Sequence, residues 1–105
     1  MEFVETHAFS RRLQALLADE EYRRLQDELI ADPEAGDKIP GTGGIRKLRW
    51  SARGHGKRGG ARIVYFWHGR SERLLLLFIF TKNERVDLTA DQRRQLRSIV
   101  DREYS

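Results

Sequence analysis

Residues 62–80 read RIVYFWHGRSERLLLLFIF, and this stretch decides the fold. Its first part, Arg62 to Trp67, is rich in β-branched and aromatic residues, which are typical of a strand. A polar stretch that contains Gly69 follows, and a turn is expected there. The last part, Leu74 to Phe80, is apolar at every position and fits a central strand with both faces covered. Two antiparallel strands within a sheet are therefore predicted.

A third strand is predicted just upstream, at residues 45–51, where side chains alternate between the two faces. Lys47 and Arg49 share one face of this strand. Residues 52–60, ARGHGKRGG, are too rich in glycine for regular structure and predict a hairpin connection. Residues 39–44 are predicted to form a loop before the strand. The opposite face carries Arg46, Leu48 and Trp50.

The first part of the chain predicts a short strand at residues 3–6 and two helices. The leucines at positions 13, 16 and 17 have the i, i+3, i+4 spacing of a helix, with Thr6 or Ser10 available as its cap. Asp19 is expected to cap a second helix, because acidic residues follow it in the first turn. That helix should end at Asp32, since a residue before proline avoids the helical region. We expect the two helices to form a hairpin packed on the sheet.

The C-terminal segment predicts a third helix. Thr89 and Gln92 have the spacing of a capping box, and Leu96, Ile99 and Val100 follow as an apolar face. The predicted order along residues 1–105 is β-α-α-β-β-β-α. This order describes a single α+β domain in which the helix hairpin packs on a small, mostly antiparallel twisted sheet.

The composition limits the classes of protein and site. With 105 residues, the chain is long enough for one domain with one core. It contains no cysteine, which excludes a disulfide scaffold, a thiolate metal site and a cysteine nucleophile. No pair of histidines has metal-ligand spacing, so we expect neither a metal nor another cofactor. The N-terminus lacks an apolar signal segment and the longest apolar run is too short to span a bilayer, so we expect a cytoplasmic protein.

Basic charge is concentrated in the middle of the chain. Residues 41–71 contain eight Lys and Arg and no Asp or Glu, whereas residues 1–40 contain five basic and ten acidic residues. Most glycines lie in the same stretch, and glycine lets a backbone approach a polyanion closely. A solvated basic loop is one interpretation, but the stretch also covers predicted strands, which favours a nucleic-acid partner. The basic residues are Arg46, Lys47, Arg49, Arg53, Lys57, Arg58, Arg62 and Arg70.

Three segments together resemble the RelE superfamily of bacterial toxins, and most closely its HigB-like branch. They are GTGGIRKLRW at 41–50, GKRGGARIVYFW at 56–67 and TKNERVDLTADQRRQL at 81–96, and the resemblance covers nearly the whole chain. It implies a RelE-like fold and the toxin of a type II toxin–antitoxin system. Such a toxin enters the ribosomal A site and cleaves mRNA through the 2′-hydroxyl, without a metal. The implied partners are the ribosome, mRNA and a HigA-like helix-turn-helix antitoxin; operator DNA would be contacted only through the antitoxin complex, and no membrane is implied.

The resemblance also assigns candidate catalytic residues. Lys47, Arg49 and Arg62 match family positions that bind the scissile phosphate or assist proton transfer. Arg62 suits a planar clamp on phosphate oxygens. Lys47 is a candidate general base, because neighbouring cations favour its neutral form. Lys82, just beyond the apolar strand, would close the cluster from the other side.

Further basic residues are expected to hold flanking RNA phosphates rather than take part in the chemistry. Some family members have an arginine after the lysine of the post-strand turn and a tyrosine at the start of the last helix. This chain has Asn83 and Thr89 there, so the general acid and base stay unassigned. The candidate RNA-binding residues are Arg46, Arg53, Lys57 and Arg58.

Two other functions remain open at this point. ParE-like relatives of the same superfamily poison DNA gyrase, although such a poison does not need dense cations on the strands. A non-catalytic basic module would bind RNA or DNA with a strongly salt-dependent affinity, without cleavage. Growth arrest with cut mRNA would distinguish the ribonuclease from both alternatives.

Overall fold

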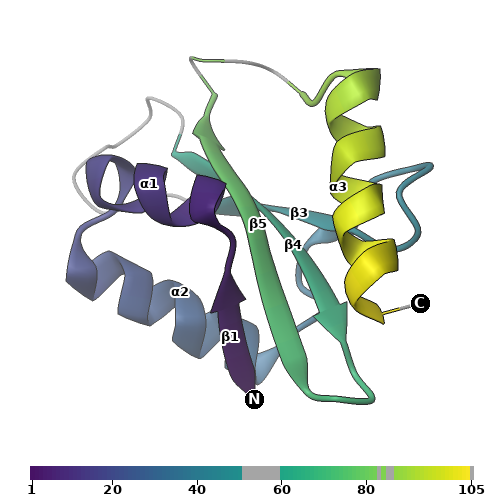
Figure 1. Ribbon diagram of the computed structural model, residues 1–105. Coiled ribbons are helices and arrows are strands. Elements are labelled where there is room, and N and C mark those ends of the chain that lie inside the picture. Colours follow the sequence, from purple (N-terminus) through teal and green to yellow (C-terminus); the bar gives the residue numbers. More distant parts are fainter. Residues whose placement is uncertain (51–59, 83, 85–86, 105) are drawn as a thin grey trace.

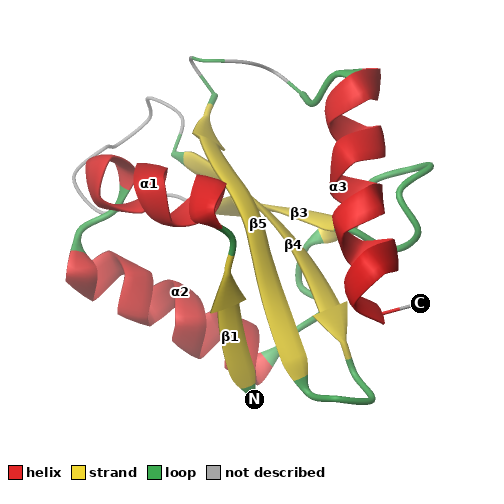
Figure 2. Cartoon of the chain, in the orientation of Figure 1, coloured by secondary structure: helices red, strands yellow, loops and turns green. Residues whose placement is uncertain are grey.

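A computed structural model of the chain describes residues 1–50, 60–82, 84 and 87–104. The fold is α+β, with three helices around a five-stranded mixed sheet (Figures 1 and 2). The helix pair α1 and α2 covers one face of the sheet and α3 covers the other. The elements are β1 (Glu2–Glu5), α1 (His7–Leu16), α2 (Asp19–Ala31), β2 (Asp37–Lys38), β3 (Arg46–Trp50), β4 (Ala61–His68), β5 (Arg73–Thr81) and α3 (Ala90–Tyr104).

The sheet has the strand order β1-β5-β4-β3-β2. The predicted antiparallel pairing of the strands at 62–67 and 74–80 is confirmed, and β5 is covered on both faces as expected. β1 runs parallel to β5, so the sheet is mixed. The two-residue strand β2 was not predicted, because Asp37 and Lys38 lack strand propensity. Asp37 lies opposite Lys47 of β3 and Lys38 lies opposite Arg46. β2 adds one strand to the predicted order.

The helix ends show which capping predictions hold. Thr6 caps α1, since its Oγ1 accepts a hydrogen bond from Phe9 N at 3.1 Å. The prediction that Asp19 caps α2 is wrong: Ala18 is the cap residue, and the carboxylate of Glu21 accepts from Ala18 N at 2.9 Å instead. None of the helices in the described ranges is long and apolar enough to cross a membrane.

The predicted capping box of the last helix is confirmed. Thr89 N donates to Gln92 Oε1 at 2.9 Å, and Gln92 N donates to Thr89 Oγ1 at 3.1 Å. The helix then buries Leu96 and Val100 against the sheet. This packing places α3 beside the sheet face that carries the candidate site.

Two hydrophobic cores lie on the two faces of the sheet. Phe9, Leu25 and Leu29 of the helix pair contribute to one core, and residues of α3 contribute to the other. A β-bulge shifts the register of β5, because Val64 lies opposite Phe78 whereas Tyr65 lies opposite Leu76. The bulge brings Phe80 to the face covered by α3.

Candidate nucleic-acid interface

Three predicted catalytic cations share the sheet face that α3 covers. In the β3–β4 ladder Lys47 lies opposite Val64, and Arg49 lies opposite Arg62. Val64 is part of the core on the α3 side, and Phe80, opposite Arg62, belongs to the same core. Side chains alternate along each strand, so Lys47, Arg49 and Arg62 project from this one face. The structure thus brings together residues that are separated by up to fifteen positions.

The pair of Arg49 and Arg62 places like charges directly across two strands. Such pairs destabilise a sheet. Among the described residues, neither arginine has an ion-pair partner within 4.0 Å. Arg49 is exposed and Arg62 is half-buried at the start of β4. Residues that destabilise the local structure are expected at functional sites, and this like-charge pair is an example.

Asp87 joins the cluster, and sequence reasoning missed it. Its Oδ1 lies 3.4 Å from Lys47 Nζ, and its Oδ2 lies 3.2 Å from Arg93 Nη2. Partial burial raises the pKa of the Asp87 carboxyl, but the Leu88 N–H and the charges of Lys47 and Arg93 outweigh burial, so the pKa is below its ordinary value. Asp87 is therefore an anion near neutral pH. No sequence signal pairs it with Lys47, because forty residues separate them.

The Lys47–Asp87 contact affects the role of Lys47. Lys47 Nζ donates a hydrogen bond to Asp87 Oδ1 in this contact. The charged form donates hydrogen bonds and binds phosphate, whereas a general base requires the neutral amine. The geometry therefore favours Lys47 as a phosphate-binding cation or a proton donor.

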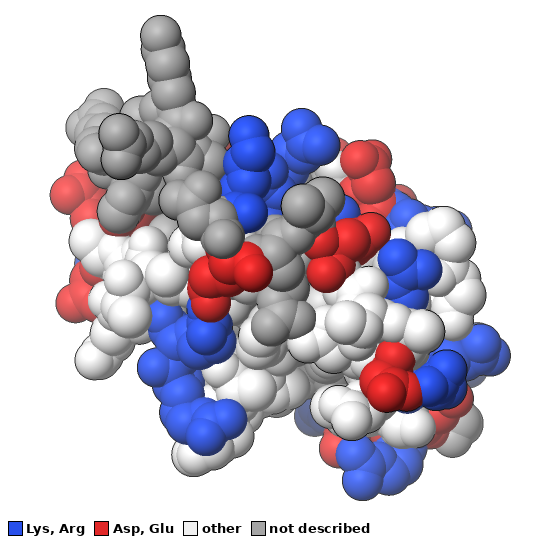
Figure 3. Space-filling model, turned by 90° about the horizontal axis from the view of Figure 1, so that it is seen from above, with Lys and Arg blue, Asp and Glu red and all other residues white. Residues whose placement is uncertain are grey.

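A groove of about 400 Å³ opens beside these residues. Lys38, Lys47 and Arg49 line it, together with two carboxylates, Asp37 and Asp87, and with Pro40 of the loop after β2. Figure 3 looks down on the molecule from above Figure 1 and shows basic side chains next to acidic ones. The surface in this view therefore carries both signs of charge and is not a uniform basic patch.

Lys82 lies at the same end of the sheet as Arg62. It follows β5 directly, and the last residue of β5, Thr81, lies opposite Ala61. Glu84 lies nearby but is engaged elsewhere: it accepts from Thr81 N at 2.9 Å and pairs with Arg12 of α1. The hydrogen bond from Thr81 and the Arg12 charge lower the pKa of Glu84. The carboxylate is thus held toward α1.

The predicted RNA-binding residues have different positions. The structure separates Arg46 from the other cations, on the opposite face of β3 with a side chain that is only 14% exposed. Its guanidinium donates to Gly36 O at 2.8 Å and pairs with Glu34 at 3.1 Å, so it anchors the connection from α2 to β2. Arg53, Lys57 and Arg58 lie outside the described residues.

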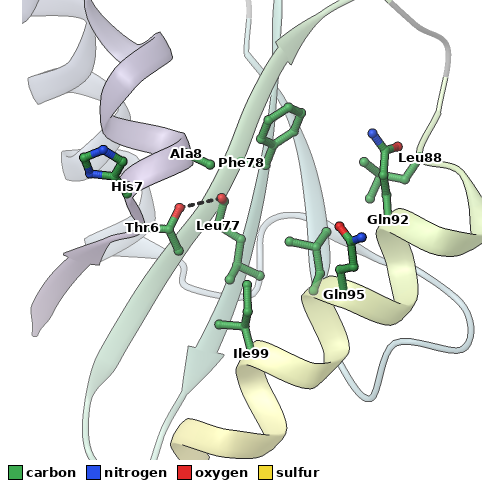
Figure 4. A pocket seen from close by; sticks show the side chains of 10 residues that line it. Thr6, His7, Ala8, Leu77, Phe78, Leu88, Gln92, Gln95 and Ile99 are labelled. Atoms are coloured by element: carbon green, nitrogen blue, oxygen red, sulfur yellow. Dashed lines mark hydrogen bonds between the residues drawn. The ribbon is translucent and has the colours of Figure 1, made fainter.

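A second hollow, of about 390 Å³, lies between the start of α1, β5 and α3 (Figure 4). Leu77 and Phe78 of β5 and Ile99 of α3 line it, and Thr6 Oγ1 donates to Leu77 O at 2.7 Å on its wall. No lysine, arginine or carboxylate is among its described lining residues. Its apolar chemistry does not suit a phosphate ligand.

Cationic hydrogen-bond donors gather at the groove beside Lys47. Arg49, Lys38 and Lys47 line it and Arg62 lies opposite Arg49 in the ladder. Guanidinium groups match phosphate oxygens in pairs. No protein-family model matches the chain.

Proposed function

We propose that this protein is the toxin of a type II toxin–antitoxin system, with a RelE-like fold and a HigB-like activity. The toxin cleaves mRNA in the ribosomal A site, and a HigA-like antitoxin neutralises it in the cytoplasm. The observation that carries this proposal is the Arg49–Arg62 pair beside an open groove that Arg49, Lys47 and Asp87 line. The resemblance of the three sequence segments supplies the substrate class.

The proposed reaction is an internal transesterification of RNA. The 2′-oxygen attacks the adjacent phosphorus while the 2′-proton is removed, and the bond from phosphorus to the 5′-oxygen breaks. The leaving 5′-oxygen takes up a proton. The products are a 2′,3′-cyclic phosphate on one fragment and a 5′-hydroxyl on the other. No oxidant, water or metal is consumed in this step.

The cations of the groove have distinct parts in this reaction. Arg62 and Arg49 stabilise the extra negative charge on the phosphorane oxygens, the type of interaction that contributes most to such reactions. Lys47 donates a hydrogen bond or a proton to the departing 5′-oxygen. Asp87 is a positioning residue that holds Lys47 and Arg93. Lys82 contacts the RNA strand from the end of β5.

The experiment is expression of three forms of the chain in a bacterial host: wild type, Arg62→Ala and Arg70→Ala. Arg70 is the matched control, because it is an exposed arginine in the turn at the other end of the β4–β5 hairpin. We expect wild type and Arg70→Ala to arrest growth and to leave mRNA with new 5′ ends in register with codons. We expect Arg62→Ala to cut about a hundredfold to a thousandfold more slowly, as is typical when a group that stabilises transition-state charge is removed.

The outcomes separate the three functions. Growth arrest with DNA damage and intact mRNA would indicate a gyrase poison and would contradict the ribonuclease proposal. RNA binding without growth arrest or new 5′ ends would indicate a non-catalytic module. Loss of folding in Arg62→Ala is tested by circular dichroism, and Arg62→Lys provides a second variant that keeps the charge but lacks the planar fork.

A further inference from the structure

A row of arginines on α3 leads away from the candidate site. Arg93 contacts Asp87, and Arg97 follows one helical turn later. Arg97 lies beside the loop that connects β2 to β3, since its Nη1 donates to Gly41 O at 3.4 Å. Figure 1 shows this loop projecting beside the middle of α3. The two arginines of α3 therefore extend from the groove to the loop between β2 and β3.

The loop beside Arg97 is held in a fixed shape. Thr42 is fully buried, and its hydroxyl donates to Ile39 O at 2.6 Å and accepts from Ile45 N at 3.2 Å. Ile39 N donates a hydrogen bond to Ile45 O at 2.8 Å, and this bond joins the two ends of the loop. Gly43 and Gly44 have φ angles of 77° and 109°, which only glycine adopts readily. The loop is thus preformed and needs no ordering when a ligand binds.

The loop has backbone donors that no other described residue uses, and open space beside Gly41 and Gly43. No hydrogen bond within the described parts of the chain uses the backbone N–H groups of Gly43 or Gly44. A side chain at Gly41 would meet nothing within 4 Å, and one at Gly43 would meet only Arg97 Nε, at 3.9 Å. Backbone N–H groups without a protein partner are donors that an anion can use.

The charges around Arg97 leave its guanidinium available. Asp101 is the carboxylate that faces it, with Oδ2 at 3.8 Å from Nε. Both side chains are more than half exposed, 54% for Arg97 and 63% for Asp101, so solvent screens the pair and it contributes little. Arg97 can therefore turn toward a phosphate at little cost.

We propose that Arg97 and the outer side of the 41–44 loop form a second RNA phosphate site, separate from the scissile site. This inference rests on the proposed function and extends it, because it assigns the path of the RNA strand across the α3 side of the protein. Arg93 lies between the two sites and connects them. The ligand is an RNA phosphate, which either the messenger or ribosomal RNA can supply.

The test measures the salt dependence of binding for wild type and Arg97→Ala. One arm uses a 2′-O-methyl oligoribonucleotide of about 12 nucleotides, within the usual size of a single-strand site. The other arm uses ribosomes programmed with a 2′-O-methyl message. We expect Arg97→Ala to reduce the slope of log K against log salt by about 0.7, which corresponds to about fivefold weaker binding at 0.1 M salt.

Two further variants serve as controls. Arg94→Ala removes an exposed arginine of the same helix that pairs with Asp91, and its slope should equal that of wild type. Asp101→Asn removes the opposing carboxylate and should tighten binding at low salt only, because salt screens exposed charges. A merely structural role of Arg97 does not predict this gain.

Each outcome decides the proposal. A reduced slope in both arms assigns the site to the messenger, and a reduced slope with ribosomes alone assigns it to ribosomal RNA. An unchanged slope for Arg97→Ala in both arms overturns the second site, and leaves the proposed function intact if wild type still binds and cuts. If wild type binds RNA in neither arm, both the second site and the proposed function fail.

Discussion

Asp87 forms ion pairs with Lys47 of β3 and Arg93 of α3. It lies between Lys47 and Arg93, at 3.4 Å and 3.2 Å, and it lines the groove together with Asp37. The Lys47–Asp87 ion pair lies at the groove, because both residues line it. An incoming phosphate would compete with Asp87 for the same ammonium group.

The lowered pKa of Asp87 predicts a pH effect on stability. A carboxyl with a lowered folded pKa stabilises the fold at pH values above its unfolded pKa, and this contribution is lost as pH falls through the folded pKa. We therefore expect wild type to exceed Asp87→Asn in free energy of unfolding by a constant amount at pH 5 to 7. The difference should shrink below the ordinary value of 3.8. It should stay under about 1 kcal/mol, because the side chain is partly exposed.

Urea unfolding of both forms at several pH values measures this difference. A gap between wild type and Asp87→Asn that widens as the pH falls below 3.8 would show that the carboxyl does not have a lowered pKa.

At the scale of secondary structure elements, the connection from α2 to β2 packs against β3 and Tyr65. Gly36 N donates to Tyr65 Oη at 2.9 Å, and Tyr65 Oη donates to Pro33 O at 2.9 Å. Tyr65 is fully buried, and burial raises the pKa of its hydroxyl. The strand that carries Lys47 and Arg49 is thus fixed by contacts on its opposite face.

Gly36→Ala tests this packing. The new Cβ would lie 2.9 Å from Tyr65 Cε1 and 3.1 Å from the backbone of Lys47, so the ring or the strand must move. We expect a loss of about 1–3 kcal/mol in the free energy of unfolding, the usual cost of an overfilled interior. Urea unfolding at neutral pH measures it.

Gly69→Ala is the matched control, since its Cβ would meet Trp67 Nε1 at 3.4 Å, an ordinary contact. We expect it to stay within about 0.5 kcal/mol of wild type. Equal stability of Gly36→Ala and wild type would contradict the tight approach of this connection to β3.

Sequence patterns that span a few residues predicted the structural features that depend on neighbouring residues. The alternation in β3 gave the shared face of Lys47 and Arg49, and the Thr89 and Gln92 pair gave the start of α3. What the sequence did not reveal depends on contacts between distant segments. The bulge in β5 is such a case, because an all-apolar run has no alternation to show a change of register.

At the scale of the whole molecule, opposite charges predominate in different stretches of the sequence. The helix pair belongs to residues 1–40, which carry five basic and ten acidic residues, whereas residues 41–71 carry eight basic and no acidic ones. Lys47, Arg49 and Arg62 lie on the sheet face away from this pair. An RNA strand is therefore expected to approach on the α3 side. The view in Figure 3 shows that acidic side chains interrupt the basic ones on this surface.

The most direct test of the ribonuclease proposal is the chemistry of the cut ends. Purified protein is mixed with ribosomes programmed with a message, and with the same message carrying 2′-deoxy nucleotides in the A-site codon. We predict that the all-ribose message is cut to a 5′-hydroxyl end and a 2′,3′-cyclic phosphate, and that the deoxy message stays intact. Cleavage of the deoxy message, 5′-phosphate ends, or no cleavage of either message would contradict the proposal.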